Sequence, residues 1–132
     1  MTDTETPVNV YEALNRAIDS LGFVAPDGLN TNQGFSFRSI DGVVGAIRPV
    51  LIEHGLTIIP SFQSLEQIDY AKPDAKVHHR SVLQATFRVI GPDGSEFEFT
   101  TVGEAMDTEG RASNKAMSAA TKNAYIRLFQ IG

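Results

Sequence analysis

The sequence contains no cysteine, and this absence removes disulfide bonds, thiolate metal sites and cysteine nucleophiles from consideration. A chain without cysteine also suits a reducing compartment. No apolar run approaches the roughly 20 residues that a membrane-spanning helix needs. The N-terminal stretch is polar and acidic, without the basic flank and apolar segment of a secretory signal, so we expect a cytoplasmic protein.

The motifs of nucleotide-dependent and nucleophilic enzymes are also missing. The sequence has neither a G-x-x-x-x-G-K-[ST] phosphate loop nor a G-x-G-x-x-G turn after a strand. No serine or threonine has a convincing base and orienting acid. His78 and His79 are adjacent, so on a strand they would point to opposite faces, and no second ligand pair has a useful spacing for a metal. We therefore expect no metal, no cofactor and no enzymatic activity.

Positive charge is scarce overall but concentrated at one end. The net charge of −5 argues against a protein that coats nucleic acid with its whole surface. Residues 1–75 hold four basic and ten acidic residues, whereas residues 76–132 hold seven basic and six acidic ones. After Glu109 there is no acidic residue, and four basic ones follow: Arg111, Lys115, Lys122 and Arg127. Such a local excess indicates either an anionic partner or a solvated helix face.

The length of 132 residues and the hydrophobic fraction of 42% are typical of one globular domain. We expect a disordered tail over residues 1–8 and a single folded domain over residues 9–132. Asn9, with Glu12 three residues later, resembles a capping box, and apolar residues then recur at helical spacing up to Gly22. This pattern predicts a helix over 9–21. The turn-forming residues of 25–34 predict a loop.

Residues 35–40 alternate apolar and polar side chains and predict a short strand. A second helix should follow, capped by Ser39 or Asp41 and ended by Gly55. Its expected buried stripe consists of Val43, Val44, Ile47, Val50 and Leu51. Pro49 lies inside this helix and should kink it near Gly45. Two short helices are the alternative, but the apolar stripe continues across the proline and favours one.

The middle of the chain predicts an antiparallel hairpin. Residues 56–62 read as a strand that Pro60 places at an edge or a bulge. Residues 64–79 show no period and predict a mobile excursion. Residues 81–90 alternate clearly, with Leu83, Ala85, Phe87 and Val89 on one face. The turn 91–94 then leads into a strand over 96–102, where Glu96 or Glu98 could pair with Arg88.

The last helix is rich in alanine and should begin at Ser113 or Asn114. Its predicted buried stripe consists of Met117, Ala120, Ala124, Leu128 and Ile131. Together these elements predict an α+β fold, in which helices pack a small antiparallel sheet made of a hairpin and one or two further strands.

A groove of basic side chains that follows phosphates is typical of single-strand binding. Lys115 and Lys122 are seven residues apart and share one side of the helix, and Arg111 would align with them. Arg127 stands off that line. Arg38 and Arg80 could extend the groove, and Phe35, Phe37 and Tyr125 could either stack on bases or pack in the core. One helix with four cations is a small site, so a useful groove would need repetition around an oligomer.

Two other interpretations remain open at this point. A loop could gather Glu104, Asp107 and Glu109 around Mg²⁺, as in a metal-dependent nuclease. The basic helix could instead meet an acidic patch of a neighbouring copy, which would make the chain a plain assembly module.

The segment from Gly103 to Phe129 resembles the signature of the ERF (essential recombination function) proteins of phages. That signature has a Gly-x-Ala-x-Asp segment and then a basic-Ala-x-x-Lys-Ala run into an alanine-rich helix, here Gly103 to Asp107 and Arg111 to Ala116. A second segment also resembles the family: an aromatic-x-aromatic strand at 35–37, followed by a helix with an internal proline and the His-Gly-Leu exit of 54–56. The resemblance covers about residues 9–132.

The resemblance implies a protein of the Rad-fifty-two-like annealing superfamily and its annealing fold. Such proteins form homo-oligomeric rings or filaments and pair complementary single-stranded DNA without ATP during phage-type recombination and repair. It also implies the bacterial host cytoplasm as location, and a host or phage single-strand binding protein as a further partner. Arg111, Lys115 and Lys122 match the basic positions of the signature. Family members usually continue into a variable tail, so residues 9–132 are interpreted as a core that lacks it. Phenylalanine at 35 and 37 replaces the commoner tyrosine, which favours core packing.

Overall fold

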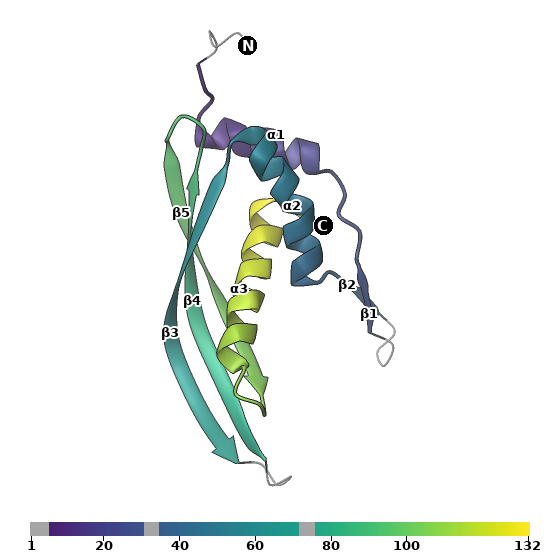
Figure 1. The fold of residues 1–132 in the computed structure, drawn as a ribbon, viewed down its shortest axis with the longest axis vertical. Helices are drawn as coiled ribbons and strands as arrows, with labels where there is room; N and C mark the ends of the chain where they lie inside the picture. The colour runs from purple at the N-terminus through teal and green to yellow at the C-terminus, as the bar shows by residue number, and fades with distance from the viewer. Residues whose placement is uncertain (1–5, 31–34, 72–75) are drawn as a thin grey trace.

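The computed structural model describes residues 6–30, 35–71 and 76–132, which form three helices and two antiparallel sheets. The helices are α1 (Val10–Leu21), α2 (Ile40–His54) and α3 (Ala112–Leu128). A small hairpin joins β1 (Gly28–Asn30) to β2 (Phe35–Phe37), and the main sheet consists of β3 (Thr57–Ala71), β4 (Val77–Ile90) and β5 (Glu96–Asp107). In Figure 1, α3 runs along the curved main sheet, α1 crosses one end, and the small hairpin projects beyond α2. The predicted α+β class is confirmed.

The main sheet has β4 at its centre, with β3 and β5 as edges. The predicted alternation along β4 is confirmed, since Leu83, Ala85, Phe87 and Val89 are all buried on one face. The predicted cross-strand pair lies on the opposite face, where Arg88 Nε is 3.0 Å from Glu96 Oε1. Pro60 lies in β3, an edge strand, as expected for a residue that cannot donate to a ladder.

Helix α3 lies unusually close to the sheet, and Gly103 of β5 makes this approach possible. A Cβ atom on Gly103 would lie 2.1 Å from Ala116 O and 2.8 Å from Ala120 Cβ. The hydroxyl of Thr101 also donates to Ala120 O over 3.0 Å. The buried stripe of α3 consists entirely of small residues at a spacing of four: Ala112, Ala116, Ala120 and Ala124.

This stripe corrects the predicted one in part. Ala120 and Ala124 are buried as expected, but Met117 and Leu128 are only half-buried at its sides, and Ile131 lies beyond the helix end. The helix also begins earlier than Ser113 or Asn114, at Ala112. The sequence pattern was misleading because large apolar residues dominate a periodicity, whereas here the closest contact requires the smallest side chains.

A second core joins α1 and α2 to one end of the sheet. Its largest buried side chains include Val10 of α1, Val43 and Ile47 of α2, Val89 of β4, and Phe129. The predicted helix ends are confirmed: Asn9 and Ser39 side chains accept the N–H groups of Glu12 and Gly42, over 2.9 and 3.0 Å, and Gly22 and Gly55 follow the last helical residues. Val8 also packs against this core, whereas residues 1–5 of the predicted tail lie outside the described residues.

Helix α2 is continuous through Pro49, which favours the single helix over the two short ones. The expected kink near Gly45 stays a prediction. One member of the predicted stripe is wrong, because Val44 is 38% exposed while Val43, Ile47 and Val50 are buried. The cap is Ser39 and not Asp41.

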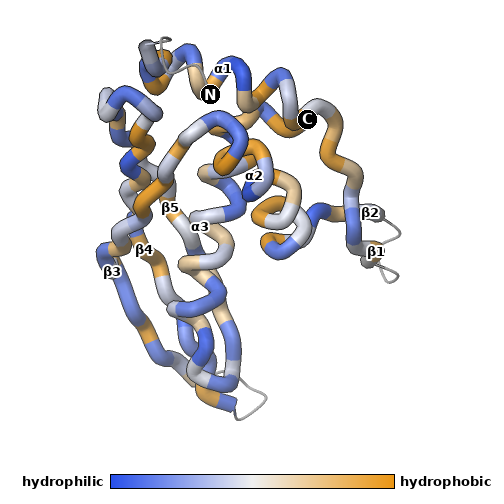
Figure 2. The backbone as a smooth tube through the Cα atoms, turned by 45° about the horizontal axis from the view of Figure 1, so that its top comes forward, coloured by the Kyte–Doolittle hydropathy of each residue, from blue (hydrophilic) through white to orange (hydrophobic). Residues whose placement is uncertain are grey.

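Several boundaries predicted from the sequence are wrong. The predicted loop 25–34 contains β1, which pairs with β2, although residues 31–34 lie outside the described part. The strand predicted over 35–40 is β2, and it already ends at Phe37. The predicted excursion 64–79 is mostly strand, since β3 continues to Ala71 and β4 begins at Val77, with 72–75 not described. Strand β5 likewise extends to Asp107. The far part of β3 is exposed on both faces and mostly hydrophilic (Figure 2), so it carries no alternating pattern.

Candidate nucleic-acid interface

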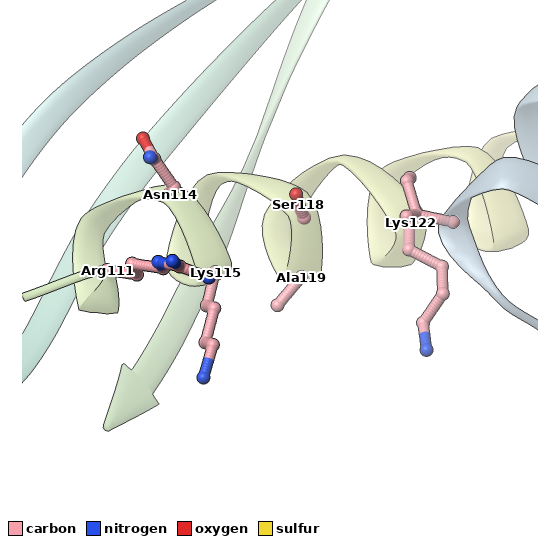
Figure 3. A pocket seen from close by; sticks show the side chains of 7 residues that line it. Arg111, Asn114, Lys115, Ser118, Ala119 and Lys122 are labelled. Atoms are coloured by element: carbon pink, nitrogen blue, oxygen red, sulfur yellow. The ribbon is translucent and has the colours of Figure 1, made fainter. Parts of the chain in front are cut away.

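The face of α3 that points away from the sheet borders a cavity of about 380 Å³. Its lining combines three cations with small and aliphatic groups: Arg111, Lys115, Lys122, Asn114, Ser118, Ala119 and Ile40. In Figure 3, Lys115 and Lys122 extend from the same side of the helix, with Ala119 between them. The structure therefore brings together the three basic residues that the sequence placed on one line.

The turn before α3 is organised by Asp107, the last residue of β5. Its Oδ1 accepts the N–H groups of Glu109 and Arg111, over 3.2 and 3.0 Å, and its Oδ2 lies 3.2 Å from Lys115 Nζ. Gly110 has a φ of 79°, which a side chain would strain. Burial by itself would raise the pKa of Asp107, but the Arg111 N–H, the Lys115 ammonium and the Glu109 N–H outweigh it, and the net pKa is lowered.

Lys122 has a different kind of contact, because its ammonium donates to the carbonyl of Arg38 over 3.3 Å. The Arg38 guanidinium points elsewhere: Nε donates to Val24 O over 2.8 Å, and a second nitrogen donates to Gly132 O. Arg38 thus braces the chain segments beside α2, and it meets the site through its carbonyl. A role of its side chain in binding an anion stays a prediction.

The other two candidate cations lie apart from this cavity. Arg127 borders a separate cavity with Asn123, Ile126, Gln130 and Ile131. Arg80 belongs to β4 and forms ion pairs with Glu66 and Glu104, over 2.6 and 2.7 Å. It shares the strand parity of Arg88, on the sheet face that α3 does not cover. The pKa of Arg80 is raised, mainly by its hydrogen bond to Glu104.

The acidic residues of the nuclease alternative have divergent partners. Glu104 pairs with Arg80, Asp107 pairs with Lys115, and Glu109 lies 3.7 Å from Arg111. Among the residues that the structure describes, no group of three His, Asp or Glu side chains could hold a metal ion. His79 Nδ1 is instead 2.6 Å from Asp69 Oδ1.

The aromatic candidates are divided between core and surface. Tyr125 packs edge-on against Phe87, with ring centroids 6.2 Å apart, and burial raises its pKa. Phe37 is 42% exposed on the small hairpin. The interpretation of the Phe35 side chain lies outside what the structure describes.

Sequence reasoning missed the uncharged part of the site. Ser118 falls between Lys115 and Lys122 at the 3, 4 spacing of a helix face, and Ile40 comes from the beginning of α2. The helical spacing that aligned the cations would also have identified Ser118 and Ala119. Nothing local in the sequence indicates that Ile40 lies opposite them.

None of the helices in the described ranges is long and apolar enough to cross a membrane. The comparison with curated proteins found no match. A family model described as the ERF superfamily matches residues 10–132, nearly the whole chain, and the chain therefore belongs to the ERF superfamily.

Proposed function

We propose that this protein binds single-stranded DNA along the exposed face of α3 and anneals complementary strands without ATP, as a homo-oligomeric ring or filament. One observation carries the proposal: Arg111, Lys115 and Lys122 border a single cavity on one helix face. Membership of the ERF superfamily supports a role in phage-type recombination. The bacterial cytoplasm is the proposed place of action.

The size of the site supports binding of a short piece of backbone by each copy. Lys115 and Lys122 are seven residues apart, which corresponds to about 10 Å along a helix axis. One strand of a B-form duplex advances about 3.4 Å per nucleotide, so the interval matches roughly three nucleotides. A contact this short supports only weak binding by one copy, and an oligomer that repeats it would hold a longer strand.

The chemistry of the lining supports binding that does not depend on sequence. Cations contact phosphates, which carry no base identity, whereas specificity needs hydrogen bonds to base edges. Among the described residues, the uncharged part of the lining is Ile40, Ala119, Ser118 and Asn114, and none of these four carries an aromatic ring on which a base would stack. Bases would then remain free to find their complements, as annealing requires.

Replacing two of the cations tests the interface. In a filter-binding titration with labelled single strands, Lys115→Ala/Lys122→Ala should weaken binding to all sequences alike, and should flatten the salt dependence, since each phosphate contact that is lost removes about 0.7 from the slope. Arg127→Ala is the matched control, because it removes one charge from the same helix outside the cavity. Wild-type affinity in the double variant would refute the interface.

A second assay separates annealing from strand cleavage. Complementary single strands are mixed with the protein in the presence of Mg²⁺ and without ATP. The proposal expects faster duplex formation with both strands intact. Shortened strands that disappear with Asp107→Ala would instead identify a nuclease.

A further inference from the structure

Lys115 already has an anionic partner in the free protein. Its ammonium lies 3.2 Å from Asp107 Oδ2, and the Lys115 side chain is 56% exposed while that of Asp107 is only 6% exposed. Lys115 can therefore reach solvent, whereas its carboxylate partner stays inside the turn between β5 and α3.

The Asp107 carboxylate is held in place independently of Lys115. Its other oxygen, Oδ1, accepts the N–H groups of Glu109 and Arg111. Among the described residues, Oδ2 receives no hydrogen bond that would replace the ion pair. If Lys115 turned toward a DNA phosphate, a largely enclosed carboxylate oxygen would lose this charged partner, which is unfavourable.

We propose that Asp107 is an internal competitor of the DNA phosphate at Lys115, and that it lowers the affinity of this interface for single-stranded DNA. This inference rests on the proposed function. A phosphate binds Lys115 only if it replaces the Asp107 carboxylate in an ion pair. Lys122 would instead give up a hydrogen bond to the neutral carbonyl of Arg38 and a weaker electrostatic attraction to Asp27. The two lysines are thus inequivalent, although they share one helix face.

Weak binding at Lys115 suits an annealing protein, because a strand that is held too tightly cannot shift to find its complement. The Asp107 carboxylate also stays close to Lys115 when a phosphate replaces it in the ion pair. Its two N–H bonds keep it beside Lys115 while a phosphate is bound, so it favours release of the strand.

The variant Asp107→Asn tests the inference, since asparagine keeps an oxygen acceptor for the two N–H groups and loses the charge. A labelled oligothymidylate should bind this variant more tightly, on the order of fivefold, as expected for loss of one competing ion pair. The slope of log affinity against log salt should steepen by about 0.7, since one more lysine becomes available to a phosphate. A change confined to the stability of the turn would not steepen this slope.

Lys115 provides the second half of the test. The gain from Asp107→Asn should vanish in a Lys115→Ala background, because no ammonium remains to be released. Asp19→Asn is the control, because it makes the same change of charge at an exposed position of another helix, α1. A gain from Asp107→Asn that persists without Lys115, or that Asp19→Asn reproduces, would overturn the inference.

Two further outcomes keep the inference apart from the proposed function. In the wild-type background Lys122→Ala should reduce affinity more than Lys115→Ala, and this comparison holds even if Asp107→Asn does not fold. Binding that is lost with Lys122→Ala but unchanged with Asp107→Asn would overturn the inference alone. Absence of any binding by the wild-type protein would overturn both.

Discussion

Three aspartates fix the beginnings of the three helices. Asp93 accepts the N–H and hydroxyl of Ser95, over 2.9 and 2.5 Å, and Ser95 Oγ in turn accepts the first N–H of α1, that of Val10, over 2.8 Å. Asp27 accepts the N–H of Ser39, the cap of α2, over 2.7 Å, together with its hydroxyl. Asp107 plays the corresponding role before α3. In each case the carboxylate accepts the N–H of a residue that caps or contacts the first turn of the helix: Ser95, Ser39 or Arg111.

Because of these contacts, the free energy of unfolding should depend on pH. Hydrogen bonds from the Ser95 side chain and N–H lower the pKa of Asp93, and those from Ser39 lower the pKa of Asp27. A carboxylate with a lowered folded-state pKa contributes stability above its unfolded pKa of about 3.9, and this contribution is lost as the pH falls through the lower value. We expect the free energy of unfolding to decrease steeply below about pH 4.

Asp93→Asn should reduce this acid sensitivity, because asparagine keeps an acceptor for Ser95 but does not titrate. The measurement is the urea midpoint at neutral pH and at about pH 3. Asp19→Asn, a change on the exposed face of α1, should leave the wild-type pH dependence intact. An unchanged pH dependence in Asp93→Asn would show that other groups control acid unfolding.

At the scale of elements, the contact between α3 and β5 positions the whole basic face. Gly103→Ala should destabilise the protein by about 1–3 kcal/mol, because the added methyl group would overlap main-chain atoms of Ala116 and force the helix outward. Urea unfolding measures this loss. We also expect weaker single-strand binding at the same temperature, since the cations of α3 move with the helix.

Gly45→Ala in α2 is the matched control for this substitution. A Cβ atom there would have no neighbour within 4 Å, and replacing a helical glycine should stabilise by about 0.5–1 kcal/mol. The same chemical change should therefore act in opposite directions at the two positions. Equal effects would mean that the close approach of α3 does not limit the side chain at 103.

Elements that are stabilised by their own local sequence could be predicted, whereas elements that depend on a distant partner could not. Helices α1 and α2 carry their own caps and apolar stripes, so their positions were predictable. The far part of β3 is stabilised by pairing with β4, as in Gln67 opposite Ser81, and no local pattern reveals such a partner. The line of Arg111, Lys115 and Lys122 followed from helical spacing, but the ion pair of Lys115 with Asp107 requires the turn around Gly110.

For the whole molecule, the distribution of charge decides what α3 can bind. The chain has a net charge of −5, yet three cations gather at one cavity. Acidic surface on a neighbouring copy and DNA phosphates would therefore compete for the same face. On the proposed function this face belongs to DNA, and contacts between copies must use other surfaces.

Mass measurement with and without single-stranded DNA distinguishes these two uses. Lys115→Ala/Lys122→Ala should leave the mass of the DNA-free assembly unchanged and should abolish most of the mass added with DNA, because the lost charges face phosphates and not a neighbouring copy. Arg127→Ala should change neither mass by much, although it removes a charge from the same helix. The opposite result would be that, without DNA and at low salt, the double variant dissociates while the Arg127→Ala control stays assembled. The basic face of α3 would then hold copies together.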